Sequence, residues 1–388
     1  GGMEINLDKI KCDDIVKILF AENPGVVIQV ADKHKAEVKK ILEDAGVGYV
    51  KIGVPTEERH ILATLHNATY QFGIDYLRDV WYSTSYLLDR KQSMNGCAKK
   101  RFENYKQQPL EFVFDKSFTG KLSQFGLDPN RRTPSGIKAA IIREKGTNGE
   151  REMAYMLYLA GFDVKDVTMT DLISGRETLE DINMVVYCGG FSNSDVLGSA
   201  KGWAGSFLFN PKAKAALDNF YAREDTLSLG VCNGCQLMME LGLITPEDKK
   251  KGKMLHNDSH KFESNFLGVT VPMNRSVMFG SLSGSKLGIW VAHGEGKFSL
   301  PYPEDHYNVV LKYSYDEYPG NPNGSDYSVA GIASQDGRHL AMMPHLERAC
   351  FPWENAYYPL DRKEEDQITP WMEAFVNARK WVEANRKK

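Results

Sequence analysis

The stretch LSLGVCNGCQLMMELGL, residues 227–243, places an apolar run next to a helical pattern across a tight turn. LSLGV (227–231) predicts a buried strand, and QLMMELGL (236–243) predicts a helix. Between them, the Gly-x-Cys-x-Gly pattern of residues 230–234 is typical of a nucleophile elbow, a sharp strand-to-helix turn that exposes one reactive side chain. The flanking glycines leave room that a Cβ would fill. The stretch therefore predicts that Cys232 is held above the edge of a sheet.

Strand and helix patterns alternate on both sides of this turn. A capping box of Thr147 and Glu150 predicts a helix that runs through Leu159 and ends at Gly161. The alternation predicts an α/β fold with an open, mostly parallel sheet flanked by helices, in which ligands bind beyond the carboxyl ends of the strands. Residues 266–300 and 326–343 predict more strands, with an antiparallel arrangement left open. The other predicted elements are strands KAAIIR (138–143), FDVKDVTM (162–169) and MVVYCGG (184–190), and a helix near 211–222.

The first 136 residues read as a partial α+β segment followed by a linker. They predict a strand at 26–30, a helix at 33–45, a strand at 47–54 and an amphipathic helix at 76–90. DPNRRTPSG (128–136) is typical of a domain boundary. We therefore expect three parts: residues 1–66, a helix and linker at 67–136, and an α/β domain at 137–388. Gly1 and Gly2 read as a cloning scar, and the chain as a piece of a larger protein.

Composition narrows the classes of function. The chain has 388 residues and a formal net charge of −3, which gives no electrostatic case for binding nucleic acid. No stretch approaches the roughly 20 apolar residues that span a bilayer, so no membrane partner is expected. The six cysteines have no regular spacing and predict no disulfide framework, which favours a cytoplasmic location.

Cys232 admits four interpretations. As a nucleophile, it would gain from the helix that follows, whose N-terminal dipole favours a thiolate and whose Asn233 N–H can stabilise an oxyanion. It can also be a buried packing cysteine, a redox pair with Cys235, or half of a zinc site. Zinc would require a second ligand pair, and no other Cys-x-x-Cys occurs. The strand order does not suggest a thioredoxin-like fold, so the nucleophile is the favoured interpretation.

A nucleophilic cysteine needs a base that a third group orients. Two His-x-Glu pairs follow Cys232 in the sequence: His293 with Glu295, and His345 with Glu347. Spacing i,i+2 puts both side chains on one face of an extended segment. The second pair follows the apolar strand LAMMP, at the edge where a parallel sheet carries its site. Spacing favours the second pair without excluding the first.

The motifs together resemble the class I, triad-type glutamine amidotransferases, whose sheet is flavodoxin-like. In detail they resemble the phosphoribosylformylglycinamidine synthase family. The matching segments run in the family's order from about residue 138 to 380, and the first 130 residues resemble the end of the family's synthetase part and its bridge. The segments that carry the resemblance are AIIREKGTNGEREMA, VVYCGGFSNSDVLGSAKGWA, FNP, GVCNGCQLM, VAHGEGKF, NPNGS, AGIASQDGR, MMPHLER and PWMEAFVNAR.

This resemblance implies a catalytic triad of Cys232, His345 and Glu347. It implies an oxyanion hole from the backbone of Gly190 or Phe191 and of Asn233, and a glutamine site lined by Gln236, Gly294 and Glu295. Leu346 stands where the family usually has proline, for which we expect only a local effect.

The resemblance also implies a function. L-Glutamine would be hydrolysed to glutamate and ammonia through a cysteine γ-glutamyl thioester, as the amidotransferase half of a ligase of purine biosynthesis. The ammonia would serve the ATP-dependent conversion of formylglycinamide ribonucleotide to formylglycinamidine ribonucleotide in synthetase domains that this chain lacks. ATP and magnesium are expected in those domains, and no cofactor or metal in this chain. The alternatives are a catalytically silent module of the same fold and a redox or cysteine-hydrolase protein.

Overall fold

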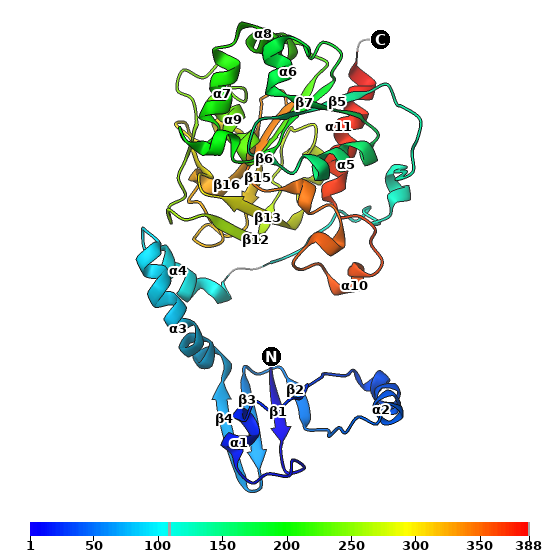
Figure 1. Cartoon of the computed structure of the whole chain (residues 1–388), viewed down its shortest axis with the longest axis vertical. Coiled ribbons are helices and arrows are strands. Elements are labelled where there is room, and N and C mark those ends of the chain that lie inside the picture. Colours follow the sequence, from blue (N-terminus) through cyan, green and yellow to red (C-terminus); the bar gives the residue numbers. More distant parts are fainter. Residues whose placement is uncertain (108–109, 387–388) are drawn as a thin grey trace. The chain divides into compact units, whose positions relative to one another are not determined.

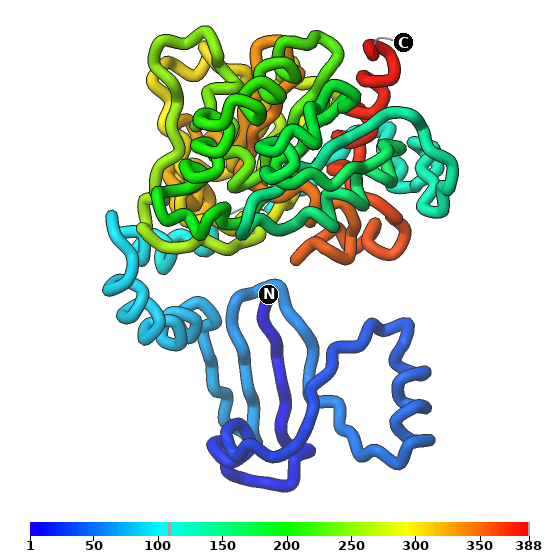
Figure 2. The backbone as a smooth tube through the Cα atoms, turned by 45° about the horizontal axis from the view of Figure 1, so that its top comes forward, coloured from blue at the N-terminus to red at the C-terminus, as the bar shows by residue number. Residues whose placement is uncertain are grey.

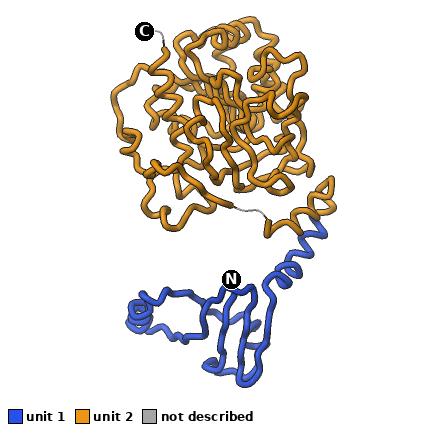
Figure 3. Tube along the Cα trace, turned by 180° about the vertical axis from the view of Figure 1, so that it is seen from behind, with its two compact units in different colours: residues 1–89 blue, residues 90–388 orange. Residues whose placement is uncertain are grey.

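The computed structural model describes residues 1–107 and 110–386. The chain divides into two compact units, Gly1–Asp89 and Arg90–Lys388 (Figure 3). Each unit is described by itself. The division lies inside the segment that the sequence assigns to a helix and linker.

The first unit contains a four-stranded sheet in the order β2-β1-β3-β4. Its small core consists of Leu7, Ala63 and Leu65. The predicted helix at 76–90 is confirmed as α3, which starts at Ile74 and ends at Gln92. The other elements are β1 (Gly2–Asn6), α1 (Ile15–Phe20), α2 (Lys35–Asp44), β2 (Gly53–Thr56), β3 (His60–Leu65) and β4 (Ala68–Gly73).

The strand predicted at residues 26–30 does not form, so this prediction was wrong. Val26, Val27 and Ile28 are 87%, 76% and 57% exposed and lie in irregular backbone. A strand needs a neighbour to bond its N–H and C=O groups, and this segment pairs with none among the described residues. The strand predicted at 47–54 is wrong over most of its length, since only its last two residues enter β2.

The described part of the second unit is built on a nine-stranded sheet. Five strands pair in parallel in the order β7-β5-β8-β10-β17. This parallel half confirms the predicted α/β class. Its strands are β5 (Lys138–Arg143), β7 (Asp163–Thr168), β8 (Met184–Tyr187), β10 (Leu227–Val231) and β17 (His339–Met342).

An antiparallel half continues the sheet from β17 in the order β16-β15-β12-β13. Three of these strands, β12, β13 and β16, fall in the ranges 266–300 and 326–343 where the sequence predicts strands, and their pairing here is antiparallel. The fourth strand, β15, lies between those ranges and was not predicted. The bounds of the four strands are β12 (Glu263–Thr270), β13 (Lys286–His293), β15 (Asn308–Tyr313) and β16 (Val329–Ala333). Two short antiparallel pairs lie outside the main sheet: β6 (Thr147–Asn148) with β9 (Gly189–Gly190), and β11 (Lys253–Leu255) with β14 (Lys297–Ser299).

Helices flank the parallel half of the sheet. In Figure 1, α6 to α9 gather at one side and α5 lies beside α11 at the other. This placement follows from the strand–helix–strand crossovers, which put helices on both faces of a parallel sheet. The helices of this unit are α4 (Cys97–Glu103), α5 (Glu150–Ala160), α6 (Met169–Ser174), α7 (Lys201–Leu208), α8 (Pro211–Ala222), α9 (Asn233–Glu240), α10 (Leu360–Lys363) and α11 (Trp371–Asn385).

The capping box predicted for α5 does not form. The N-cap residue is Gly149, with a φ of 83°, and it makes no side-chain cap. Thr147 instead pairs with Gly190 between β6 and β9, and its hydroxyl donates to the carbonyl of Glu144. Tertiary pairing has thus overridden a local signal. The predicted end of the helix at Gly161, with a φ of 102°, is confirmed.

Residues that precede β5 pack on the rest of the second unit. Phe118 is buried in its core, and the Phe114 ring stacks on Tyr358 with centroids 5.7 Å apart. Gln367 donates its backbone N–H to the carbonyl of Gly120 over 2.7 Å. In Figure 2 residues 115–136 run along the outside of this unit. No helix in the described ranges is long and apolar enough to cross a membrane.

Candidate active site

Cys232 lies in the turn between β10 and α9. Its backbone has φ 53° and ψ −107°, a strained conformation for a residue with a Cβ. The backbone N–H of Cys232 donates to the carbonyl of Met342 over 2.9 Å, which ties the turn to the end of β17. The side chain is 5% exposed. The predicted elbow is therefore present, at the carboxyl end of two parallel strands.

The two glycines of the elbow are required because other backbone atoms lie too close to leave room for a Cβ. A Cβ on Gly230 would lie 2.5 Å from the carbonyl oxygen of Gly234. A Cβ on Gly234 would lie 2.1 Å from the carbonyl oxygen of Tyr187 on β8. Because these neighbours are backbone atoms, they cannot rotate away. The expectation that side chains here would block the turn is confirmed.

His345 and Glu347 follow β17 and face each other. The His345 Nδ1 lies 2.7 Å from the Glu347 Oε1, and the two residues are 2% and 1% exposed. His345 is extended, but Leu346–Arg348 forms a 3₁₀ turn, so the pair is not carried by a fully extended segment as predicted. The turn still brings the two groups together. Leu346, where the family usually has proline, is buried in the core.

The charge of His345 depends on its partners. Burial acts to lower its pKa, but the Glu347 carboxylate and the hydrogen bond to Cys232 outweigh burial and raise the pKa to about 10. Arg348 Nε lies 3.7 Å from the same Glu347 Oε1. The raised pKa keeps His345 in its charged form beside Cys232.

Gly189 allows the cysteine and the histidine to share one small space. A Cβ placed on Gly189 would lie 2.8 Å from His345 Cε1 and 3.4 Å from Cys232 Cβ. Both side chains therefore pack against the backbone of this one residue. The Cys232 thiol also donates to the carbonyl of Ala292 over 3.5 Å.

His293 and Glu295 do not pair with each other. His293 Nδ1 lies 3.1 Å from Asn257 Oδ1, whereas Glu295 Oε2 accepts the backbone N–H of Ser199 over 3.2 Å. Burial and the charge of His345 lower the pKa of His293 to about 3, so this imidazole is neutral. The geometry therefore favours the second His-x-Glu pair as the partner of Cys232.

Cys232 opens onto a cavity of about 270 Å³. Both predicted pairs contribute to this region, since His293 and Glu295 line the cavity while His345 and Glu347 lie behind Cys232. The lining residues are Gly190, Phe191, Asp195, Ser199, Cys232, Gln236, His256, His260, Lys261, Phe262, Ala292, His293, Gly294 and Glu295.

Asn233 and Gln236 are linked by a hydrogen bond next to this cavity. Asn233 Nδ2 donates to Gln236 Oε1 over 2.8 Å, and Gln236 Nε2 donates to the carbonyl of Glu295 over 2.8 Å. The backbone N–H of Asn233 lies at the first position of α9, where no intrahelical acceptor exists. The structure thus brings Gly190, Phe191, Asn233, Gln236, Gly294 and Glu295 together around Cys232.

Gly190 and Phe191 differ in what their backbone can offer. The N–H of Phe191 donates to the carbonyl of Gly146 over 2.8 Å, so it is already engaged. Gly190 has a φ of 117°, and a Cβ there would lie 2.5 Å from the Gly146 oxygen. Of the two, Gly190 is the better candidate for an oxyanion donor.

Sequence reasoning missed several cavity residues. Burial and the nearby Glu295 raise the pKa of Asp195, although the backbone N–H of Ala200 opposes this rise. His256 and His260 stack with ring centroids 5.6 Å apart at the same cavity. Asp195 ends a short 3₁₀ helix and the two histidines lie in a loop, and such short segments carry no periodic signal. Two sequence signals mark these positions: the polar segment HNDSH (256–260), and FSNSD (191–195) within a segment that carries the family resemblance.

Cys235, the other cysteine of the motif, is fully buried, and burial raises the pKa of its thiol well above the usual range. It is a free thiol, as is Cys232. Within the described residues, no group of three or more His, Cys, Asp and Glu side chains could hold a metal ion. The packing interpretation therefore suits Cys235.

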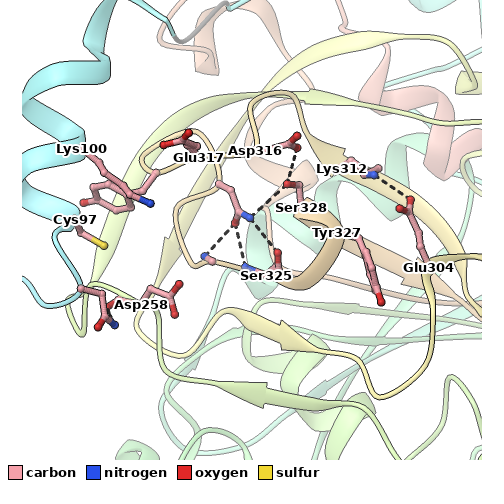
Figure 4. Close-up of a pocket in the computed structure, with 14 residues that line it drawn as sticks. Cys97, Lys100, Asp258, Glu304, Lys312, Asp316, Glu317, Ser325, Tyr327 and Ser328 are labelled. Atoms are coloured by element: carbon pink, nitrogen blue, oxygen red, sulfur yellow. Dashed lines mark hydrogen bonds and ion pairs between the residues drawn. The ribbon is translucent and has the colours of Figure 1, made fainter.

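A second, larger cavity of about 560 Å³ lies elsewhere in this unit. Figure 4 shows it with Cys97, Lys100 and Asp258 at one end and Tyr327 and Glu304 at the other. Neither Cys232 nor His345 lines it.

Comparison with known proteins finds relatives that are named phosphoribosylformylglycinamidine synthases. The chain is 37% identical over 410 residues to the probable phosphoribosylformylglycinamidine synthase, chloroplastic/mitochondrial, of Arabidopsis thaliana, covering 99% of this chain and 28% of that protein. It is 38% identical over 406 residues to the phosphoribosylformylglycinamidine synthase of Homo sapiens, covering 95% of this chain and 29% of that protein. The Drosophila melanogaster protein of the same name is 36% identical over 395 residues, with coverages of 95% and 29%.

The chain thus spans less than a third of the length of these relatives. Residues 136–382 match the CobB/CobQ-like glutamine amidotransferase domain. The match takes in most of the chain, including the elbow, the His345–Glu347 pair and the cavity. The chain therefore belongs to the family of CobB/CobQ-like glutamine amidotransferase domains.

Proposed function

We propose that this chain hydrolyses L-glutamine to glutamate and ammonia, with Cys232 as nucleophile, His345 as general acid and base, and Glu347 as the group that orients His345. One observation carries the proposal: a cysteine at a strained elbow opens onto a cavity beside a buried His–Glu pair whose atoms are 2.7 Å apart. A nucleophile, its base and an orienting group are the parts that covalent catalysis needs.

In the first step the Cys232 thiolate attacks the carboxamide carbon of glutamine, and a C–S bond forms. The negative charge moves to the carboxamide oxygen, where the backbone N–H groups of Asn233 and Gly190 would stabilise it. His345 then gives its proton to the amide nitrogen, and the C–N bond breaks. Ammonia leaves, and a γ-glutamyl thioester remains on Cys232.

In the second step His345, now neutral, takes a proton from water as the water oxygen attacks the thioester carbon. The C–S bond breaks, and the sulfur leaves as a thiolate beside the imidazolium. The new carboxyl group gives its remaining proton to the released ammonia or to water, glutamate leaves, and Cys232 and His345 return to their starting states. Glu347 keeps the imidazole in one orientation and stabilises its charged form through both steps.

The charges of the cavity suit a free amino acid. Burial raises the pKa of Asp195, and the nearby Glu295 carboxylate raises it further, so a cation between the two carboxylates would be stabilised. The α-ammonium of glutamine is such a cation. In this proposal Gln236 and Gly294 complete the glutamine site, because Gln236 fixes the carbonyl of Glu295.

The names of the relatives suggest where the ammonia goes. We place it in the ATP-dependent conversion of formylglycinamide ribonucleotide to formylglycinamidine ribonucleotide, in the part of the relatives' length that this chain does not cover. ATP and magnesium belong to that part of the proposal. A cytoplasmic location accords with six free cysteines. Nothing in the described residues supports the silent, redox or cysteine-hydrolase alternatives.

The test is glutamate release from glutamine by the chain and by its Cys232→Ala variant, together with covalent labelling by diazo-oxo-norleucine, a glutamine-derived electrophile. Cys235→Ala is the matched control, because Cys235 is buried in α9, three residues after Cys232, and does not line the cavity at Cys232. We expect release and labelling in the wild type and the control, and neither in Cys232→Ala. Full release or unchanged labelling in Cys232→Ala would contradict the proposal.

A further inference from the structure

Asn257 is a fully buried polar residue that does not itself line the cavity at Cys232, here called the glutamine cavity. It lies in the segment 257–259, here called the brace, between β11 and β12. In front of the brace lies the segment His293–Gly296, here called the glutamine loop, which includes three residues that line the cavity.

Asn257 bonds the glutamine loop through its backbone and both ends of its side chain. Its N–H donates to the carbonyl of Gly294 over 2.9 Å. Its Nδ2 donates to the carbonyls of His293 and Lys261 over 2.7 and 2.9 Å. Its Oδ1 accepts the N–H of Gly296 over 3.0 Å. One residue therefore holds three of the four residues of the loop.

These bonds also fix the state of His293. Because Asn257 Nδ2 faces two carbonyls, its Oδ1 must be the atom that faces His293 Nδ1, at 3.1 Å. His293 therefore carries its proton on Nδ1 and leaves Nε2 as an acceptor. That buried Nε2 has no hydrogen-bond partner within the described residues.

The outer side of the brace is held by a second set of bonds. Asn95 Nδ2 donates to the carbonyl of Asp258 over 2.8 Å, and the N–H of Met94 donates to the carbonyl of Ser259 over 3.0 Å. Both residues follow α3 closely in sequence. Lys297, next to the glutamine loop, places its Nζ 2.7 Å from Asp258 Oδ1. Asn95 and Asp258 also line the larger cavity of Figure 4.

We propose that the brace positions the glutamine loop, and that the segment Met94–Asn95 sets through the brace how tightly the loop holds glutamine. This inference rests on the proposed function. Asn257 is then a positioning residue, which acts on the substrate only through His293, Gly294 and Gly296. Loosening the brace should weaken substrate binding more than it slows bond breaking, because the triad bonds are separate from it.

Two variants test the proposal. Asn95 is exposed and has a φ of 55°, so Asn95→Gly removes only the side-chain bond and suits the backbone. Asn257→Asp keeps the acceptor but loses both Nδ2 donors. We expect KM for glutamine to rise about three- to tenfold in Asn95→Gly and about tenfold or more in Asn257→Asp. We expect kcat to change by less than about threefold in both. Asn385→Gly is the control, because it removes a bond that lies within α11.

Two further readouts separate this inference from the proposed function. Labelling of Cys232 by diazo-oxo-norleucine should need a higher concentration in both variants, whereas labelling by iodoacetamide should keep its wild-type rate. Hydrogen exchange at the Gly296 amide should be faster in both. If the wild type shows no saturable labelling, the proposed function fails and exchange alone decides the inference. If both variants keep the wild-type KM, labelling and hydrogen exchange, the inference about the brace is overturned. If Asn257→Asp does not fold, Asn95→Gly alone provides the test.

Discussion

His345 and His293 show how one partner decides the charge of a buried imidazole. Both are buried at the same site, but His345 faces a carboxylate and His293 faces an amide. The pKa of His345 is raised to about 10, and that of His293 is lowered to about 3. Burial acts in the same direction on both, so the carboxylate of Glu347 is the main cause of the difference.

This comparison predicts the behaviour of Glu347→Gln. With the carboxylate gone, burial dominates, and the pKa of His345 should fall below 6.5. Titration of the His345 Cε1 proton by NMR between pH 5 and 9 measures this change. Glu383→Gln, which removes an exposed carboxylate on α11, is the control. A His345 that stays protonated at pH 8 in Glu347→Gln would contradict the assignment of the cause.

The same pKa has a consequence for stability. Because the folded pKa of His345 lies above the usual 6.5, its contribution to the free energy of unfolding is fully present below about pH 6.5. It is lost as the pH rises toward 10. Glu347→Gln should remove this loss, so that the wild-type advantage over the variant shrinks between those two values in urea unfolding.

Three chain segments of the site meet at a single residue, Gly189. The elbow after β10, the short strand β9 and the residues after β17 converge on the backbone of Gly189. The elbow contains a residue with strained backbone, Cys232, and β9 consists of two glycines. The site therefore depends on how closely backbones approach, as well as on which side chains are present.

Gly189→Ala tests this dependence. Its φ lies outside the left-handed region, so alanine is compatible with the backbone, but its Cβ would lie 2.8 Å from His345 Cε1. We expect kcat/KM to fall about tenfold or more, and the free energy of unfolding to fall by about 1–3 kcal/mol. Gly205→Ala in α7 is the control, because its Cβ would meet only ordinary contacts at 3.7 Å. Unchanged turnover in Gly189→Ala would show that His345 has room to move.

Sequence patterns predicted elements whose signal is local. KAAIIR and LSLGV became β5 and β10 over the same residues, because each apolar run is bounded by a turn and buried on both faces. The pattern failed where the outcome depends on a distant partner. VVIQV lacks a neighbouring strand, and Thr147 pairs with Gly190 instead of capping a helix.

The same limit applies to the site. The elbow and the two His-x-Glu pairs have fixed spacings, and sequence could therefore point to them. Asn257 and Asp195 act through bonds to residues about 40 positions away, such as Gly296 and Asn233. No spacing rule along the chain can reveal bonds of that kind. Their roles appear only once the loops are folded.

At the scale of the whole molecule, the boundary of the catalytic unit can be tested. The sequence places it at residue 137, whereas Phe114, Phe118 and Gly120 pack on residues that follow position 137. We propose that residues 90–388 fold alone with one cooperative transition in urea. A chain of residues 137–388 should lose about 2 kcal/mol or more, because burial of at least one phenylalanine is lost. Equal unfolding midpoints for the two chains would contradict this.

The position of β17 in the sheet also bears on synthesis. In the described chain β17 is the last strand in sequence, but it lies in the middle of the sheet, between β10 and β16. As the protein leaves the ribosome, the earlier strands can assemble only into two separate pieces with open edges, and such edges are prone to wrong pairing. Residues 339–342 join the two pieces by pairing with β10 and β16, and the same step brings His345 next to Cys232. In a nascent chain, Cys232 therefore lacks His345 beside it until β17 has joined the sheet.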